Sequence, residues 1–591
     1  MKDFFKSFFA SLLALILVGG MGLVLLFGVL AGIGSSGKPT VPAKALLVFD
    51  LDTSLTDGER EPEPGEALSE AMGGGGSHSQ SLPVVIEALD RAAGDARITG
   101  LFLTGNLQGA GPAQLKELRE ALQRFKAKKP VLAYNLRWSK RDFYLAAGAT
   151  TVFLNPFGEM EVNGLGSEPM FFGEAFKKYG VEVQVTRVGK YKSAVEPFIT
   201  DRMSEPSREQ MQKLLDDIWG DWKNSVAKDR KKTPADLQAV ADERAVLEAE
   251  DALRLGLVDR LAPYDEVLDE LKKLAGKQPK DKDFPQISLA TYAGIAGEAK
   301  SGKTRIAVVV AEGEIVDGEG KPSQVGGERL SRELRRLRLD DRVKAIVLRV
   351  NSPGGSVTAS ELIQREVVAT KKLKPVVISM GHVAASGGYW ISTYSDRIFA
   401  EPTTITGSIG VFGMLPNVKK LANEHGITWD SVQTAKMASL GTITRPKTEL
   451  ELARIQGIVD HIYEQFIAKV ADSRKLKREA VQEIAQGRVW SGQEALKLGL
   501  VDELGGLGDA VKHAAKLAKA EGDFYLIGPE REPDTFREIL KSIGQGKPRK
   551  LTRSGPVEVL TERFKVQFER LSALNDPRGV YARLPFDIDI N

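Results

Sequence analysis

The sequence contains no cysteine among its 591 residues. This absence excludes disulfide bonds, thiolate metal sites and a cysteine nucleophile. The chain also lacks a basic block, since its formal net charge is only +3 with 27% of its residues charged. A balanced charge without interleaved aromatic residues gives no indication of nucleic-acid binding. A single hydrophobic core is not expected at this length, so we predict two or more domains.

Long hydrophobic runs are scarce as well, with one exception near the amino terminus. Residues 8–33 carry no charge and are long enough to cross a bilayer, which takes about 20 residues. A small-x-small cleavage pattern at 43–45 lies about ten residues too far beyond the run for a signal peptide. We therefore predict an uncleaved transmembrane anchor. Lysines flank it almost equally on both sides, so the positive-inside rule does not decide its orientation.

The rest of the chain contains an internal repeat. DARITGLFL at 95–103 matches DDRVKAIVL at 340–348, and ALRLGLVDRL at 252–261 matches ALKLGLVDEL at 495–504. The offset between the copies is nearly constant, which is hard to obtain by chance. Within each copy, strand-like apolar runs alternate with helix-like segments, as in α/β proteins. The sequence therefore predicts a tandem duplication of one α/β module.

The repeat and the shifts in composition divide the chain into five parts. An acidic, glycine-rich stretch at 58–81 cannot form a core, and we predict a surface loop there. The linker between the halves is charged and contains proline and glycine, and the carboxyl-terminal extension has an irregular end. The predicted parts are a membrane anchor and stalk (1–44), a first half (45–271), a linker (272–303), a second half (304–520) and a C-terminal extension (521–591).

The most informative stretch is MGHVAASGGYW, residues 380–390, which contains Ser386. The apolar run before it predicts a buried strand, and the segment after Gly387 predicts a helix. A serine at this junction lies near backbone N–H groups and the positive end of a helix dipole. Small neighbours allow a substrate backbone to approach closely. The alternative interpretation is a tight packing turn.

A second glycine-rich turn supports the catalytic interpretation. RVNSPGGSV at 349–357 ends a predicted strand, and Gly354 and Gly355 can direct N–H groups at an anionic oxygen. The first half carries Arg141 at the position of Ser386 and has lost the proline of the turn. The first copy has therefore lost the features that suggest a nucleophile.

A serine nucleophile needs a base. His382 is near Ser386 but belongs to the junction itself, so we interpret it as structural. The better candidate is Lys192 in GKYKSA of the first half, because the second copy carries alanine there and the two copies have lost complementary groups. If this segment is extended, Lys190 and Lys192 share a face. Burial must lower the pKa of Lys192 from about 10.4 toward about 7–8, and pairing with Glu196 would oppose this.

At these residues the sequence resembles the signal peptide peptidase A (protease IV) family in its long, duplicated form. The resemblance covers nearly the whole chain and includes GKYKSAVEPF, NSPGGSV, MGHVAASGGYW and TGSIGVFG. It implies an α/β fold, a tandem duplication of a Clp-protease/crotonase-like domain preceded by one transmembrane helix. It also implies a serine peptidase with a Ser/Lys dyad. The implied roles are nucleophile (Ser386), general base (Lys192), oxyanion hole (Gly354, Gly355 and Gly387) and orientation of the lysine (Ser408).

The same resemblance implies partners and location. It implies a single-pass homotetramer in the bacterial inner membrane, anchored in the lipid bilayer by its first helix, with the catalytic part on the periplasmic side. Its substrates are then cleaved signal peptides and other unfolded hydrophobic peptides, and no metal or cofactor is needed.

Two other functions stay open. A non-catalytic crotonase-like membrane scaffold predicts that a serine-reactive probe does not label Ser386. An enzyme acting on acyl-thioesters would need an acid/base carboxylate near the Pro-Gly-Gly turn and a nucleotide pocket, and the sequence supplies neither in an obvious form. The sequence favours the peptidase.

Overall fold

The computed structural model describes residues 40–58, 79–296, 302–528, 576 and 580–584. The anchor predicted at 8–33 and most of the loop predicted at 58–81 lie outside the described residues. Within the described ranges, no helix has the length and apolar character needed to span a bilayer. The described residues from Pro42 onward belong to one compact unit that contains both halves of the repeat.

The first half forms a mainly parallel sheet with the strand order β10-β1-β4-β5-β6-β8, and β9 pairs with β6. Strands β2 and β3 form a separate short pair. The bounds are β1 (Ala45–Asp50), β2 (Ser54–Thr56), β3 (Ser79–Ser81), β4 (Ile98–Thr104), β5 (Val131–Trp138), β6 (Thr151–Glu161), β8 (Val246–Glu248), β9 (Arg260–Leu261) and β10 (Gln286–Ser288). The helices are α3 (Leu82–Gly94), α4 (Pro112–Lys126), α5 (Lys140–Ala146), α6 (Gly173–Lys178), α7 (Glu196–Ile199), α8 (Glu205–Arg230), α9 (Pro234–Glu243), α10 (Ala249–Arg254), α11 (Tyr264–Leu274) and α12 (Leu289–Ala296).

The second half repeats this plan with the strand order β20-β18-β16-β14-β11-β22, and β17 pairs with β16 and β21. The bounds are β11 (Thr304–Glu312), β14 (Val343–Ser352), β16 (Val376–Ala385), β17 (Arg397–Ala400), β18 (Ile405–Gly407), β20 (Val489–Ser491), β21 (Glu503–Leu504) and β22 (Phe524–Ile527). The helices are α13 (Gly327–Leu339), α14 (Val357–Lys371), α15 (Gly387–Ser392), α16 (Lys419–Glu424), α17 (Glu449–Arg474), α18 (Arg478–Ile484), α19 (Gly492–Lys497) and α20 (Leu507–Leu517).

The main sheets of the two halves have the same strand order, which confirms the predicted duplication of an α/β module. The long helices α8 and α17 both contain 26 residues. Each ends at a lysine in the left-handed conformation, Lys231 at φ 54° and Lys475 at φ 56°. The late strands β10 and β22 both return to lie parallel beside the first strand of their own half.

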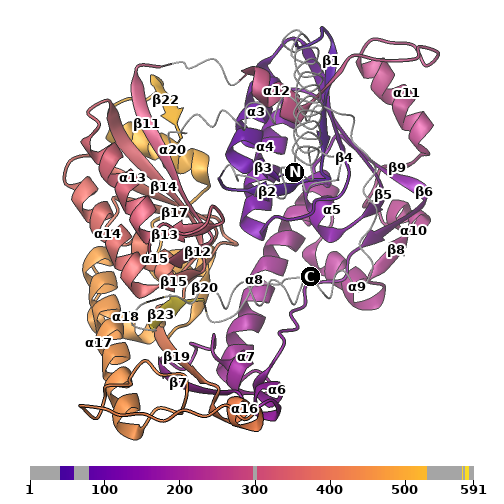
Figure 1. The fold of residues 1–591 in the computed structure, drawn as a ribbon. Helices are drawn as coiled ribbons and strands as arrows, with labels where there is room; N and C mark the ends of the chain where they lie inside the picture. Colours follow the sequence, from indigo (N-terminus) through magenta and orange to yellow (C-terminus); the bar gives the residue numbers. More distant parts are fainter. Residues whose placement is uncertain (1–39, 59–78, 297–301, 529–575, 577–579, 585–591) are drawn as a thin grey trace, which may run out of the picture. The chain divides into compact units, whose positions relative to one another are not determined.

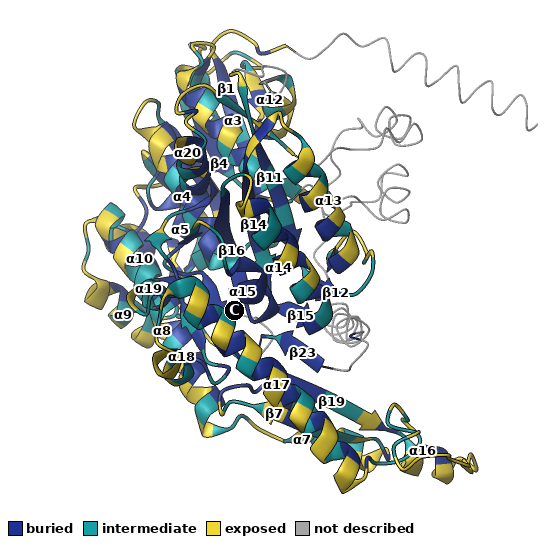
Figure 2. Cartoon of the chain, turned by 90° about the vertical axis from the view of Figure 1, so that its left-hand side faces the viewer, coloured by how far each residue is buried: buried dark blue, intermediate teal, exposed yellow. Residues whose placement is uncertain are grey.

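The core of the second half lies on both faces of its sheet. In β14, Ile346 and Leu348 pack with residues of α13, α14 and α17, whereas Ala345 and Val347 pack with α20. This alternation follows from the two-residue period of a strand, and helices on both faces let the whole strand be apolar. Figure 2 shows β14 and β16 in dark blue, and the exposed yellow surface lies on helices such as α13 and α17.

A third sheet combines both halves with the C-terminal extension (Figure 1). Its order is β13-β12-β15-β23-β19-β7, and its bounds are β7 (Glu182–Val188), β12 (Glu314–Val316), β13 (Gln324–Gly326), β15 (Gly354–Ser356), β19 (Val411–Asn417) and β23 (Val580–Arg583). Strand β7 of the first half pairs antiparallel with β19 of the second. The prediction of an irregular carboxyl-terminal end is therefore wrong for β23. The neighbouring strands β15 and β19 supply backbone hydrogen-bond partners that an isolated segment lacks.

Candidate active site

Ser386 lies between β16 and α15, and its side chain is fully buried. Its backbone has φ 55° and ψ −112°, a conformation that residues other than glycine rarely adopt. Two hydrogen bonds hold this turn: Ser386 N donates to Gly407 O at 2.8 Å, and Ser386 O accepts from Trp390 N at 2.8 Å. A strained strand-to-helix turn is also how α/β-hydrolases present a nucleophilic serine.

The glycines after Ser386 serve packing. A Cβ atom on Gly387 would lie 2.7 Å from Ser360 Oγ, and one on Gly388 would lie 2.5 Å from Ser352 O. Both distances are too short for ordinary contact, so these positions require glycine. The packing-turn interpretation therefore explains the glycines, but it leaves the surroundings of the Ser386 hydroxyl to be explained.

Lys192 of the first half contacts that hydroxyl. It follows β7 and is fully buried, and the preceding residue is held to the second half because Tyr191 N donates to Gln486 O at 3.0 Å. Lys192 Nζ lies 2.7 Å from Ser386 Oγ. Its other neighbours are Ser408 Oγ at 2.9 Å and Ser408 O at 3.1 Å. The predicted nucleophile and the predicted orienting serine thus both lie within hydrogen-bonding distance of the amine of the predicted base.

The surroundings of Lys192 favour a neutral amine. Burial lowers the pKa of Lys192 well below 10.5, and the positive charge of Arg583 lowers this pKa further. Glu196, which could have opposed this effect, instead accepts a hydrogen bond from Ser204 Oγ at 2.7 Å. A neutral amine has two N–H bonds and one lone pair, which matches three contacts. It can donate both N–H groups to Ser408 and accept the Ser386 proton.

The prediction that Lys190 and Lys192 share an extended face is wrong. The chain turns at Gly189, which has φ 99°, and Lys190 is exposed while Lys192 is buried. Lys190 Nζ lies 5.0 Å from the centre of the Tyr191 ring. A Cβ atom on Gly189 would lie 2.3 Å from Gln486 O, so close approach to the second half forces this turn.

Two glycines that were not predicted as site residues make room for the lysine. A Cβ atom on Gly487 would lie 2.7 Å from Lys192 Cβ, and one on Gly410 would lie 3.2 Å from Lys192 Cδ. Gly410 belongs to the same TGSIG motif as Ser408, and this proximity was the available signal. The second half therefore forms a slot that fits the side chain supplied by the first.

The predicted glycine turn lies beside the serine. Gly354 and Gly355 have φ 93° and 153°, which a side chain would disfavour. A Cβ atom on Gly354 would lie 2.6 Å from Gly387 N, so these two glycines are neighbours. Gly354 N itself donates to Ser352 Oγ at 3.2 Å. The turn thus lies next to the start of α15, where the first N–H groups of a helix have no intrahelical acceptor.

His382 lies apart from this arrangement. No hydrogen bond among the described residues joins it to Ser386, and within the same ranges its Nδ1 atom is buried without a partner. Burial lowers the pKa of His382 to about 4. A Cβ atom on Gly111 would lie 2.0 Å from His382 Cγ, so the imidazole packs against the first half. Across the described ranges, no three histidine or acidic side chains are grouped as metal ligands would be.

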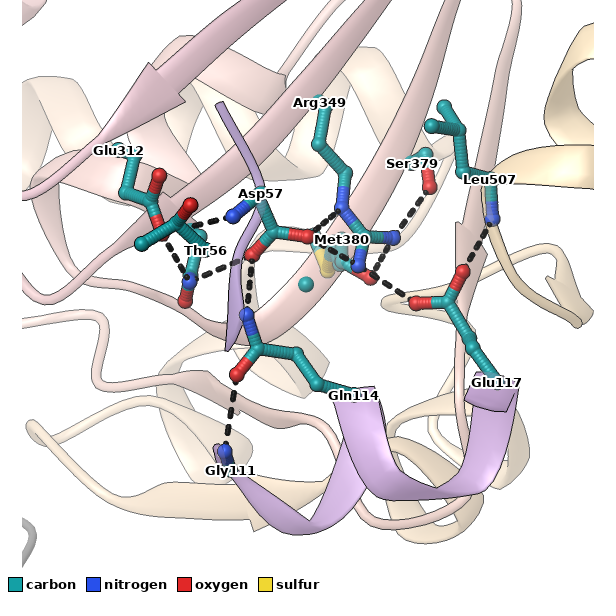
Figure 3. A network of polar contacts seen from close by, with 12 residues as sticks. Thr56, Asp57, Gly111, Gln114, Glu117, Glu312, Arg349, Ser379, Met380 and Leu507 are labelled. Atoms are coloured by element: carbon teal, nitrogen blue, oxygen red, sulfur yellow. Dashed lines mark hydrogen bonds and ion pairs between the residues drawn. The ribbon is translucent and has the colours of Figure 1, made fainter. Parts of the chain in front are cut away.

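A buried charge cluster joins residues of the two halves (Figure 3). Arg349 Nε donates to Asp57 Oδ1 at 2.7 Å, and Arg349 Nη2 donates to Glu117 Oε1 at 2.5 Å. Burial opposes the charge of Arg349, but the two carboxylates outweigh it and raise the pKa of Arg349. This cluster was not predicted from the sequence, although an arginine inside the apolar run VLRV was a signal.

The cluster extends to the strand that carries Ser386. Asn351 Nδ2 donates to Asp57 Oδ2 at 2.6 Å, and Asn351 Oδ1 accepts from Val383 N at 3.1 Å. Asn351 lies at the end of β14, beside the glycine turn, and Val383 lies in β16. Contacts from the first half therefore support both segments that border the candidate site.

Comparison with known proteins shows similarity along nearly the whole chain. The model for peptidase family S49 matches residues 123–278 and 368–521, and the model for Clp protease matches 307–405. Protease 4 of Salmonella typhi is 36% identical over 574 residues, covering 94% of this chain and 92% of that protein. Protease 4 of Haemophilus influenzae is 33% identical over 95% of this chain and 94% of its own length. The chloroplastic serine protease SPPA of Arabidopsis thaliana is 33% identical, covering 78% of this chain and 70% of that protein.

Proposed function

Because this chain belongs to peptidase family S49 and is a serine peptidase, we propose that Ser386 and Lys192 are its catalytic dyad. The observation that carries the proposal is the 2.7 Å separation of Lys192 Nζ and Ser386 Oγ in a fully buried environment. The serine is the nucleophile and the lysine is the general base. Ser408 orients the lysine through its carbonyl and hydroxyl oxygens.

The reaction begins with attack of Ser386 Oγ on a peptide carbonyl carbon. The neutral amine of Lys192 takes the Oγ proton, and the resulting ammonium gives a proton to the leaving amine as the C–N bond breaks. Water then hydrolyses the acyl-enzyme with the same lysine as base. Burial of Lys192 supports this cycle, because it lowers the pKa of the amine and so favours its uncharged form.

The tetrahedral intermediate needs hydrogen-bond donors for its oxyanion. We assign this role to backbone N–H groups of Gly387 and of the Gly354–Gly355 turn, whose adjacency supports the assignment. One such donor typically contributes about 2.7–4 kcal/mol to the stabilisation of the transition state. Glycine at these positions leaves no side chain between the donors and the substrate.

The proposed substrates are cleaved signal peptides and other unfolded hydrophobic peptides. This choice follows the resemblance of the motifs, and the residues before the serine, Val383 and Ala385, are apolar and buried. We further propose that residues 8–33 anchor the protein in the bacterial inner membrane. The catalytic part then works on the periplasmic side as a homotetramer, as the resemblance of the motifs implies.

The test compares Ser386→Ala and Lys192→Ala on a quenched-fluorescence peptide with an apolar core. Each change should lower kcat/KM by a factor of about 10³ or more, because the dyad acts as a unit. The thermal melting curves should show that both variants stay folded. Lys190→Ala is the matched control, since Lys190 is exposed, and it should keep wild-type activity. Full activity in both dyad variants would refute the mechanism.

A further inference from the structure

The strand β23 lies between the two segments that border Ser386 (Figure 1). On one side it pairs antiparallel with β15, which contains the glycine turn. On the other side it pairs antiparallel with β19, which begins at Val411, shortly after Ser408. A peptide that adds a strand to an exposed sheet edge gains main-chain hydrogen bonds in the same way. β23 therefore has the position that an extended substrate would take.

One carbonyl group of β23 lies beside the candidate oxyanion donors. A Cβ atom on Gly354 would lie 2.1 Å from Ala582 O, and a Cβ atom on Gly387 would lie 3.0 Å from the same oxygen. The chain continues in register, since Leu584 N donates to Pro353 O at 2.7 Å. The peptide bond from Ala582 to Arg583 is thus the one presented near Ser386.

The side chains of this segment fill apolar surroundings on either side of that bond. Tyr581 packs with Phe412, their ring centres 5.9 Å apart, and with Val195 of the first half. Leu584 packs with Val383 and other apolar residues of both halves. Between them, Arg583 Nε lies 2.9 Å from Glu314 Oε1 in an ion pair. The contacts alternate along the strand, as expected for recognition of an extended peptide.

A carboxylate holds the segment at its upstream end. Asp576 Oδ2 accepts a hydrogen bond from Ser356 Oγ at 2.8 Å and from Thr358 N at 3.1 Å. Ser356 is the N-cap of α14, a helix of 15 residues, so the Asp576 charge lies at the positive end of the helix dipole. Charge-assisted hydrogen bonds of this kind are stronger than neutral ones. Asp576 therefore favours the docked strand.

From these contacts we infer that β23 is an intramolecular ligand of the peptide site, which competes with peptides added from solution. The inference rests on the proposed function. It also defines the substrate: an extended peptide antiparallel to β15 and β19, with a small residue in the place of Ala582. Apolar residues take the places of Tyr581 and Leu584. The docked strand excludes another peptide whether or not its own bond is broken.

A disulfide lock tests the inference directly, because the chain has no cysteine of its own. Phe412 and Tyr581 are register partners. Such partners have Cα atoms about 4.5–5.5 Å apart, a distance that a disulfide can span. In the Phe412→Cys/Tyr581→Cys protein, oxidation should lower cleavage of a fluorogenic peptide about tenfold or more, and dithiothreitol should restore it. The two single-cysteine variants are the controls and should be unaffected by oxidation.

A second variant weakens the docked strand. Asp576→Asn should lower KM for the same peptide by about tenfold at unchanged kcat, because a larger fraction of the enzyme has an open site. Asp236→Asn is the matched control, since Asp236 also lies in the first turn of a helix, α9, but has no contact with β23 among the described residues. Melting curves check folding, and the disulfide experiment does not depend on this variant.

The outcomes separate the two proposals. If the wild-type protein cleaves peptides, equal rates for the oxidised and reduced lock, or an unchanged KM in Asp576→Asn, overturn the inference alone. If the wild-type protein cleaves nothing, the proposed function fails. Binding of a fluorescein-labelled peptide with the sequence of residues 576–586 then tests the inference separately. This peptide should bind the Asp576→Asn protein about tenfold more tightly than the wild-type protein, and equal affinity would overturn the inference.

Discussion

The amine nitrogen of Lys192 and the hydroxyl oxygen of Ser386 lie 2.7 Å apart, although 194 residues separate them along the chain. Lys192 follows β7 of the first half, and Ser386 follows β16 of the second. The antiparallel pair of β7 and β19 brings the first segment to the second half. The site is therefore complete only when both halves are folded together.

Replacing the lysine should separate activity from stability. Lys192→Met removes a buried amine and keeps a long, unbranched side chain in the slot. We expect complete loss of peptidase activity and a gain of about 0.5–2 kcal/mol in the free energy of unfolding, the usual size of a single stabilising substitution. Peptide cleavage and urea denaturation measure the two effects. A loss of stability would show that Lys192 also has a structural role.

The pH dependence follows from the lowered pKa of Lys192. Only the neutral amine can accept the Ser386 proton, so kcat/KM should fall as the pH drops below that pKa, well below 10.5. Between the folded and unfolded pKa values, the unfolded chain binds more protons, so the free energy of unfolding rises with pH. The stability advantage of Lys192→Met should therefore shrink as the pH approaches 10.5, and an unchanged difference would contradict this account.

Ser408→Ala should weaken catalysis without removing it. The change deletes the hydroxyl 2.9 Å from Lys192 Nζ but keeps the Ser408 carbonyl, 3.1 Å from the same nitrogen. We expect kcat to fall about 10- to 100-fold, the equivalent of one hydrogen bond to a catalytic group. KM should change little, because Ser408 contacts the lysine and not the peptide. Ser408→Thr keeps a hydroxyl, and partial recovery in that variant would support orientation of the amine.

Breaking the buried charge cluster should lower the free energy of unfolding strongly. Asp57→Ala leaves Arg349 with one carboxylate fewer in a fully buried site, and we expect a loss of about 3–5 kcal/mol in the free energy of unfolding. Asp90→Ala is the matched control because Asp90 pairs with Arg124 at the exposed surface. That change should cost at most about 1 kcal/mol. Chemical denaturation measures both, and equal costs would contradict the assigned role of the cluster.

The slot for the lysine can be tested by adding one methyl group. Gly487→Ala places a Cβ atom 2.7 Å from Lys192 Cβ at a position with φ 76°, so we expect lower activity and lower stability. Gly457→Ala in α17 is the control, since nothing lies within 4 Å of its Cβ position. There the change should stabilise by about 0.5–1 kcal/mol, because alanine favours the helix. Wild-type activity in Gly487→Ala would show that the slot is not tight.

The sequence by itself determined the features that depend on local pattern. The internal repeat, the alternation of strands and helices, and the strand–serine–helix junction at Ser386 can all be read from the spacing of apolar and small residues. The first copy lacks the serine and the second copy lacks the lysine, and this complementary loss also predicted a role for Lys192. These signals are carried by neighbouring residues, or by comparison of one half with the other, and they need no knowledge of the packing.

Only the tertiary structure decided how distant segments meet. In the folded protein the chain turns at Gly189, so that Lys190 is exposed and Lys192 is buried. Glu196 accepts a hydrogen bond from Ser204 and does not pair with Lys192. The fold also joins Asp57 to Arg349 and inserts β23 beside the glycine turn. Pairing between strands and removal of water from a side chain depend on partners far away along the chain. A local sequence pattern does not identify those partners, so these contacts could not be predicted without the three-dimensional structure.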